Sequence, residues 1–249
     1  MSASTIIGAI VLIAAGALLL IFIVWRKRVP ASLRRIRAYD RLNRDVGLSV
    51  ESGKRLHISL GRGDLLTARN ASAFAGLAML RQIVERASVS DRPPVVTSGD
   101  SALTILSQDA LRAGYSAAGA EEDFRVSAGR LTGLSPFAYA AGALPIARDE
   151  GVSTHIIIGD LGVESALIAD AAERQGASLV AMSDGLSAQA LLYAAAPDPL
   201  VGEELFAAGA YSGAGMSHEA SLNAQDVLRW LIIMIMLAGA ALTILGVNF

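Results

Sequence analysis

The sequence contains no cysteine. Disulfides, thiolate zinc sites and cysteine nucleophiles are therefore excluded. Histidine is scarce, with 3 in the whole chain, and neither an H-E-x-x-H zinc motif nor a G-x-S-x-G nucleophile elbow occurs. Two of the histidines, His57 and His155, fall within expected strands, which favours a structural, hydrogen-bonded role. These absences argue against a thiol enzyme, a common zinc protease and a serine hydrolase.

Charged residues are missing from two long apolar runs, residues 6–25 and residues 230–247. Each run is long enough for a helix that crosses a bilayer core of roughly 30 Å at about 1.5 Å per residue. In hydrocarbon every backbone polar group has to be paired internally, so both runs are expected to be helices. The first run has no basic segment before it and no small-residue cleavage site after it. It is therefore predicted to be an uncleaved anchor rather than a signal peptide.

Lysine and arginine are distributed unevenly around these runs. No Lys or Arg precedes the first run or follows the second, and a basic stretch follows the first. The positive-inside rule then predicts that residues 26–229 are cytoplasmic and that both termini lie outside. Part of the basic stretch is also expected to contact anionic lipid headgroups, through Arg26, Lys27, Arg28, Arg34 and Arg35. A nucleic-acid partner is not expected, because this stretch adjoins the membrane and the remaining domain is acidic.

The chain divides into a first span (1–25), a basic juxtamembrane segment (26–53), an α/β domain (54–227) and a second span (228–249). Strands are expected at residues 56–60, 94–97, 154–158 and 179–182. Helices are expected at residues 70–87, 101–113, 163–175, 187–196 and 203–211. Another helix begins at Ser135 and Pro136, with Pro145 expected to end or kink it, and residues 121–134 are expected to form a loop or a small hairpin. Strands separated by helices predict a single α/β domain whose mainly parallel, four-stranded sheet is flanked by helices.

Each of the four expected strands runs into a short loop of small residues that carries an aspartate. In a parallel sheet such loops share one edge, where the ligands of open α/β folds bind. Four carboxylates at one crevice would suit an amine, a sugar or a divalent cation. The favoured alternative is that they cap the following helices, so no cofactor is expected and no metal site is assigned. The four residues are Asp64, Asp100, Asp160 and Asp184.

Several phrases of the sequence are similar to a known family: GKRLHISLGRGDL, DRPPVVTSGDSALTILSQDALR, LTGLSPFAYAAG, IIIGDLGVESALIADAAER and PLVGEELFAAGAY. They resemble a family of prokaryotic membrane proteins, classed as a domain of unknown function, with this two-span plan. The similarity covers Gly53 to the second span. It implies a location in the prokaryotic cytoplasmic (inner) membrane, and it adds no activity, site or substrate.

Three functions are compatible with these features. The leading expectation is a non-catalytic membrane scaffold that self-assembles into a homo-oligomer. It rests on the Ala/Gly-rich stretches 137–144, 188–196 and 206–215, since small residues let helices approach closely, although the same residues would suit tight packing on the sheet. The second is a ligand- or metal-binding sensor or accessory subunit, motivated by the aspartate loops. The third, an enzyme at the membrane face that uses those aspartates with a metal, is the least favoured.

Overall fold

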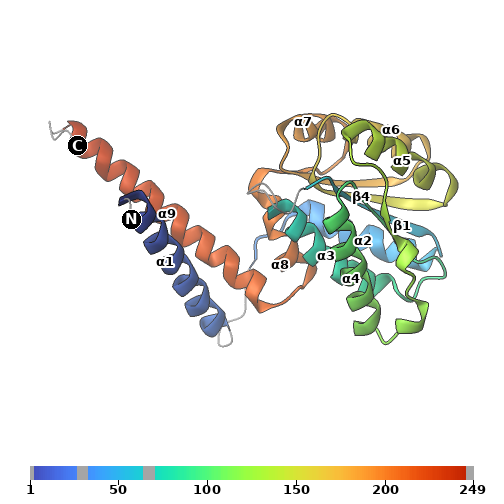
Figure 1. Ribbon diagram of the computed structural model, residues 1–249, viewed down its shortest axis with the longest axis horizontal. Coiled ribbons are helices and arrows are strands. Elements are labelled where there is room, and N and C mark those ends of the chain that lie inside the picture. The colour runs from blue at the N-terminus through green and yellow to red at the C-terminus, as the bar shows by residue number, and fades with distance from the viewer. Residues whose placement is uncertain (1–2, 27–32, 64–70, 245–249) are drawn as a thin grey trace. The chain divides into compact units, whose positions relative to one another are not determined.

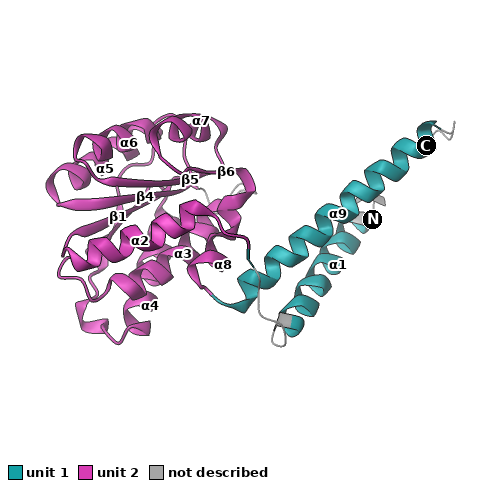
Figure 2. Cartoon of the chain, turned by 180° about the vertical axis from the view of Figure 1, so that it is seen from behind, with its two compact units in different colours: residues 1–33, 215–249 teal, residues 34–214 magenta. Residues whose placement is uncertain are grey.

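The computed structural model describes residues 3–26, 33–63 and 71–244 (Figure 1). Two structural units divide the chain (Figure 2). The first unit combines residues 1–33 with residues 215–249, and the second consists of residues 34–214. The two ends of the chain thus belong to one unit, and the other unit is inserted between them.

The first unit contains two helices that are long and apolar enough to cross a membrane. They are α1 (Ala3–Arg26) and α9 (Met216–Ile244). The two helices contact each other along antiparallel paths, so the start of α1 and the end of α9 lie at the same end of the pair (Figure 1). Helix α9 begins well before the expected apolar run, because the polar residues that precede Trp230 continue the same helix.

The second unit is built on a single sheet in which every neighbouring pair of strands is parallel. Its order is β3-β2-β1-β4-β5-β6. The sheet has six strands, so the expected number of four is wrong. The sequence missed β3 and β6 because three and two residues are too short to show an alternating pattern. The strands are β1 (Arg55–Gly61), β2 (Val95–Ser98), β3 (Gly129–Leu131), β4 (Val152–Asp160), β5 (Ser178–Ser183) and β6 (Leu200–Val201).

The helices of this unit follow the expected pattern with three differences. Helix α4 extends to Ala117, and Pro145 lies inside α5, which runs on to Asp149. Of the two effects expected of Pro145, ending the helix is therefore wrong, and a kink stays a prediction. The segment expected as one helix at 203–211 is a 3₁₀ helix followed by a short α-helix. The helices are α2 (Arg37–Glu51), α3 (Ala71–Ala87), α4 (Ser101–Ala117), α5 (Pro136–Asp149), α6 (Ser165–Arg174), α7 (Leu186–Ala195) and α8 (Ala208–Ser212), with 3₁₀ helices η1 (Glu121–Asp123), η2 (Val126–Ala128) and η3 (Gly202–Ala207).

Helices cover both faces of the sheet (Figure 2). Helices α2, α3, α4 and α8 pack on one face, where Leu56, Ile58 and Leu60 of β1 contribute to the main apolar core. Helices α5, α6 and α7 pack on the other face, around Ile157 of β4. Successive residues of a strand point to opposite faces, so each strand contributes to both layers.

Helix α2 belongs to the core of the second unit. Its Tyr39, Leu42 and Val46 are 2%, 2% and 3% exposed. The apolar side of α2 therefore packs on the sheet. The domain boundary expected between residues 53 and 54 falls inside a unit that begins at Arg34. The sequence did not show whether α2 packs on the sheet or on lipid, because an amphipathic helix has the same pattern in both situations.

Two stacked tyrosines join the ends of the second unit. The rings of Tyr39 and Tyr211 lie 4.5 Å apart at an angle of 6°. The Tyr211 hydroxyl donates to the Arg34 carbonyl at 2.6 Å, and the Tyr39 hydroxyl donates to the Glu204 carbonyl at 2.7 Å. This tyrosine clasp (Tyr39 and Tyr211) fastens the first residues of the unit to its last helix.

Candidate functional site

The strand order defines where a ligand would bind. The chain proceeds from β1 to β2 and β3 on one side, then returns to place β4, β5 and β6 on the other side of β1. Connections therefore leave β1 and β4 in opposite directions. In open parallel sheets, ligands bind at this switch point, beyond the carboxyl ends of the strands. The described segments at this place, residues 61–63, 98–100, 159–164 and 183–185, are termed the edge loops.

The edge loops pack against one another through their backbones. The amide of Arg62 donates to the carbonyl of Asp160 at 2.9 Å, and the amide of Gly99 donates to the carbonyl of Gly61 at 2.9 Å. A Cβ atom on Gly61, whose φ is 71°, would lie 2.3 Å from the Asp160 carbonyl oxygen, and one on Gly185 would lie 2.2 Å from that of Leu161. These contacts give a physical reason for the small residues that the sequence places after the strands.

An ion pair bridges the switch point. Arg62, which follows β1, places Nε 3.4 Å from Oε1 of Glu164, which follows β4. The same oxygen accepts a hydrogen bond from the Gly162 amide at 3.0 Å. The side chain of Glu164 is 2% exposed and that of Arg62 is 28% exposed. A buried carboxylate requires such a cation and donor, and the 102 residues between the partners explain why no sequence pattern indicated the pair.

The four aspartates have different surroundings. Asp100 caps α4, because its Oδ1 accepts a hydrogen bond from the amide of Leu103 at 2.8 Å. Asp160 is the last residue of β4, and Asp64 lies outside the described residues. The capping interpretation therefore describes Asp100, and a shared ligand site for the four stays a prediction.

Asp184 does not cap the helix that follows it. Helix α7 has Gly185 at its N-cap and receives no side-chain cap. The Oδ1 atom of Asp184 is buried and has no hydrogen-bond partner among the residues that the structure describes. Across the same described ranges, no group of three or more His, Cys, Asp or Glu side chains is placed to hold a metal ion. Among the described aspartates of this set, Asp184 thus has a buried carboxylate oxygen without a partner.

Large apolar side chains are exposed in the segments that end or follow the strands at this edge. Ligand clefts are mostly apolar with a few polar groups, and exposed apolar patches also mark contacts between proteins. No sequence pattern indicated these residues, because their exposure depends on the fold. They are Leu131 (46%), Leu134 (68%), Phe137 (61%), Val163 (52%), Leu186 (84%) and Val201 (39%).

Five polar side chains form a hydrogen-bonded row beneath the edge loops, on the face that α5 covers. All five belong to residues that are fully buried. In order they are His155, His57, Thr97, Tyr139 and Ser59, termed the buried polar chain. The successive distances are 2.9 Å between the two histidine Nδ1 atoms, 2.9 Å from His57 Nε2 to Thr97 Oγ1, 3.1 Å from Thr97 Oγ1 to the Tyr139 hydroxyl, and 2.6 Å from that hydroxyl to Ser59 Oγ.

Burial keeps this chain uncharged. Loss of solvation lowers the pKa of His155 to about 4. Burial also lowers the pKa of His57 well below its ordinary value, and the nearby His155 and Arg130 shift it in the same direction. Both imidazoles are neutral at pH 7 as a result. Both histidines are buried and hydrogen-bonded, as expected from the sequence. The sequence did not predict that they contact each other.

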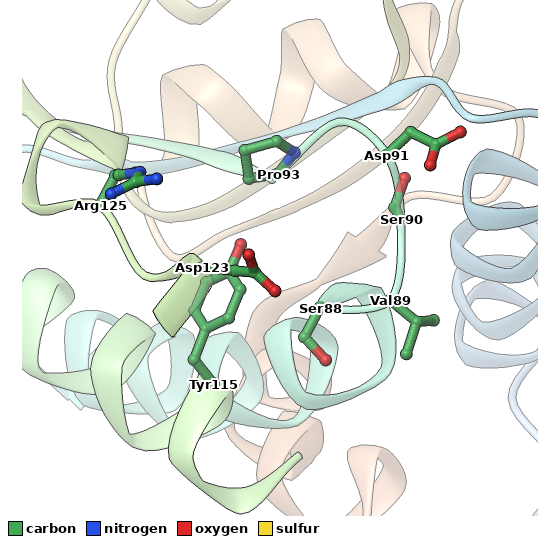
Figure 3. Close-up of a pocket in the computed structure, with 8 residues that line it drawn as sticks. All are labelled: Ser88, Val89, Ser90, Asp91, Pro93, Tyr115, Asp123 and Arg125. Atoms are coloured by element: carbon green, nitrogen blue, oxygen red, sulfur yellow. The ribbon is translucent and has the colours of Figure 1, made fainter. Parts of the chain in front are cut away.

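A pocket of about 470 Å³ lies at the opposite, amino-terminal edge of the sheet (Figure 3). Residues of the connection between α3 and β2 line it together with Tyr115, Asp123 and Arg125. The side chains of Tyr115 and Asp123 both line this pocket (Figure 3). Burial raises the pKa of Tyr115, and the charge of Asp123 adds to this shift. None of the four aspartates predicted as site residues lines this pocket.

The second unit thus has the features of a doubly wound parallel α/β domain with a switch point between β1 and β4. The chain belongs to the family described as a domain of unknown function, DUF6754, whose model matches residues 2–249. No curated protein and no solved structure matches the chain. The resemblance to a family without an assigned activity is therefore confirmed, and the function has to be argued from the geometry.

Proposed function

We propose that the second unit is a ligand-binding domain of a sensor or accessory subunit, which α1 and α9 anchor in the prokaryotic cytoplasmic membrane. The observation that carries this proposal is the switch point between β1 and β4, where open parallel sheets bind their ligands. The unit's ligand would lie over the edge loops, beside the ion pair of Arg62 and Glu164.

Polar groups at this place have unused bonding capacity. A guanidinium has five N–H donors, and Arg62 uses its Nε for Glu164. Its two terminal nitrogens hydrogen-bond to no residue within the described ranges, and we expect a ligand to use them. The Oδ1 of Asp184 is a second polar atom without a partner in the described ranges, although it is buried. Together with the exposed apolar side chains of this edge, these groups favour a small organic molecule that carries both polar and apolar parts.

Anchoring by two spans rests on the composition of α1 and α9. Both are long and apolar enough to cross a membrane, and the distribution of Lys and Arg favours extracytoplasmic termini. The proposed headgroup contact is weaker for two of the five basic residues. Arg34 pairs with Glu204 and Arg35 pairs with Asp40, so an anionic lipid would have to compete with these carboxylates.

Native mass spectrometry of the full chain, purified in mild detergent from its own host, tests ligand binding while the ligand is still unidentified. We expect a bound small molecule that is retained in wild type and lost in Arg62→Ala. The matched control is Arg174→Ala, because Arg174 forms a comparable ion pair on the surface, with Asp170. A chain that carries no small molecule, or an Arg62→Ala variant that retains it, would contradict the proposal.

A self-assembling scaffold is the second candidate. The exposed apolar side chains at the carboxyl edge favour it, since such patches occur at interfaces between proteins. The small-residue stretches are divided in this respect. Ala140, Ala143 and Ala208 are 0%, 1% and 0% exposed and pack inside the unit, whereas Ala138, Ala141 and Ala190 are exposed. The short edge strands β3 and β6 also offer little backbone for pairing between copies.

The oligomeric state in nanodiscs separates these candidates. If the apolar edge joins copies of the chain into a homo-oligomer, the variants Phe137→Ser and Leu186→Ser should shift the mass toward the monomer. Val89→Ser is a matched control, since Val89 is 76% exposed and precedes β2 at the other edge. A monomeric wild type would count against the scaffold and leave the ligand-binding proposal untouched.

A further inference from the structure

The buried polar chain has an unsatisfied end. Nε2 of His155 is buried and has no hydrogen-bond partner in the described part of the chain. The other polar atoms of the row are joined in sequence, from His57 to Ser59. A buried polar atom without a partner is costly and uncommon, so the end of this row is a feature that packing alone does not explain.

Counting protons on the two neutral imidazoles leaves two possible donor-to-acceptor directions for the hydrogen bonds along the row. If His57 donates from Nδ1, then His155 carries its proton on Nε2, which leaves a buried N–H without an acceptor. If His155 donates from Nδ1, then His57 donates from Nε2 to Thr97, and the unsatisfied atom is a lone pair on His155. Orphaned N–H groups are rarer than under-satisfied acceptors, so the second direction is favoured. In that direction His155 Nε2 is a free base inside the sheet.

The His57–His155 pair also lies on the two strands that lead into the edge loops at the switch point. His57 and His155 are register partners across β1 and β4, the two strands of the switch point. Beyond them, β1 continues through Ser59 into Arg62, and β4 continues into Glu164. Burial raises the pKa of Tyr139 and the charge of Glu164 adds to this shift, so Glu164 is within electrostatic reach of the same phenol that joins Thr97 and Ser59.

Added charge at this pair finds no compensating anion among the described residues. Arg130 of β3 is the cation that acts on His57, and its partner Glu150 at the end of α5 is shared with Arg55. From α5 the neutral Tyr139 reaches the row. Strand β5 places Leu179 opposite His155, and α6 and α7 contribute apolar side chains to this face. A buried charge without a partner is strongly unfavourable.

We propose that the His57–His155 pair is a proton switch: when His155 binds a proton at its buried Nε2, unpartnered among the described residues, the edge loops that follow β1 and β4 rearrange. The imidazolium that forms has no acceptor for its new Nε2–H and no anion beside it among the described residues, so the two rings have to shift until the charge is solvated. The strands that hold them then shift, and the shift reaches Arg62 and Glu164 directly. The switch acts as the pH falls below the ordinary histidine range.

The absence of cysteine makes a single reporter straightforward. A bimane label on Val163→Cys, in the loop after β4, would report the edge loops of the full chain in nanodiscs. We expect one reversible fluorescence transition as the pH falls below 6.5 toward about 4, the value to which burial lowers the pKa of His155, and its loss in His155→Asn, whose amide can still bond to His57. The same label on Glu173→Cys, at the end of α6, controls for general effects of pH.

The third histidine supplies the matched variant. His218 belongs to α9, so His218→Gln should leave the transition unchanged. If His155→Asn does not fold, NMR of selectively ¹⁵N-labelled histidine in wild type decides, with His57 and His155 expected to change together at the pH of the reporter transition. The proposal is overturned by a wild type without a transition, by its persistence in His155→Asn, or by its loss in His218→Gln.

Discussion

The two faces of the sheet differ although the same strands build them. Toward α2, α3 and α4, β1 presents Leu56, Ile58 and Leu60, which belong to an apolar core. Toward α5, the same strand presents His57 and Ser59, which belong to the buried polar chain. Parallel sheets that are covered on both sides are usually apolar on both. The apolar face therefore has the composition that a stable core requires. The polar residues of the other face need another reason, and we look for it in function.

The apolar face should be the more sensitive to loss of volume. Leu80 of α3 is fully buried and packs in the main core. Leu80→Ala removes buried methyl groups and leaves a cavity, so we expect a loss of about 2–5 kcal/mol in the free energy of unfolding. Chemical denaturation of the full chain in detergent, followed by far-UV circular dichroism, measures it. A loss smaller than that of Tyr139→Phe would reverse the ranking of the two faces.

The polar face should make stability depend on pH. Burial lowers the pKa of His155 from 6.5 to about 4, so in this range the unfolded chain binds a proton that the folded chain does not. The contribution is fully present above pH 6.5 and is lost as the pH falls from there toward about 4. A shift of this size corresponds to about 3 kcal/mol at most. Denaturation midpoints at several pH values should fall less steeply in His155→Asn than in wild type, and equal slopes would contradict the assignment.

The hydroxyl of Tyr139 should contribute to the free energy of unfolding, because it hydrogen-bonds to two buried groups. Tyr139→Phe leaves Ser59 and Thr97 without this partner inside the sheet, and we expect a loss of about 1–3 kcal/mol. Combining Tyr139→Phe with Ser59→Ala should cost less than the sum of the single changes, because the second change removes an orphaned hydroxyl. Strictly additive losses in the double-mutant cycle would show that the two residues are not coupled.

The tyrosine clasp should contribute less than the buried polar chain. Tyr211→Phe keeps the stacked ring and removes one hydrogen bond to the Arg34 carbonyl. We expect a loss of about 0.5–1.5 kcal/mol, the range of a typical single hydrogen bond. Tyr193→Phe is the control, because Tyr193 is 72% exposed on α7. A loss as large as that of Tyr139→Phe would indicate that the ends of the unit limit its stability.

The smallest effect should come from Asp100. Asparagine caps helices about as well as aspartate, so Asp100→Asn should change stability by less than about 0.5 kcal/mol, whereas Asp100→Ala should cost about 1 kcal/mol. Thermal unfolding of the two variants side by side compares them. A loss above about 0.5 kcal/mol in Asp100→Asn would show that the charge of Asp100 matters beyond the cap.

The sequence predicted the α/β class and every long strand, because β1, β2, β4 and β5 carry apolar runs bounded by small residues. It did not predict β3 and β6, which are too short to have a pattern, or the place of α2 in the core. It located the edge loops through their aspartates and small residues. The pairing of Arg62 with Glu164 and of His57 with His155 was out of reach, since register between distant strands determines which side chains meet.

A crystal structure of the protein purified with its natural ligand would test the central claim most directly. We expect ligand density over the edge loops, within hydrogen-bonding distance of the terminal nitrogens of Arg62. Density confined to the pocket around Tyr115 and Asp123 at the opposite edge, or edge loops covered by a second copy of the chain, would contradict it.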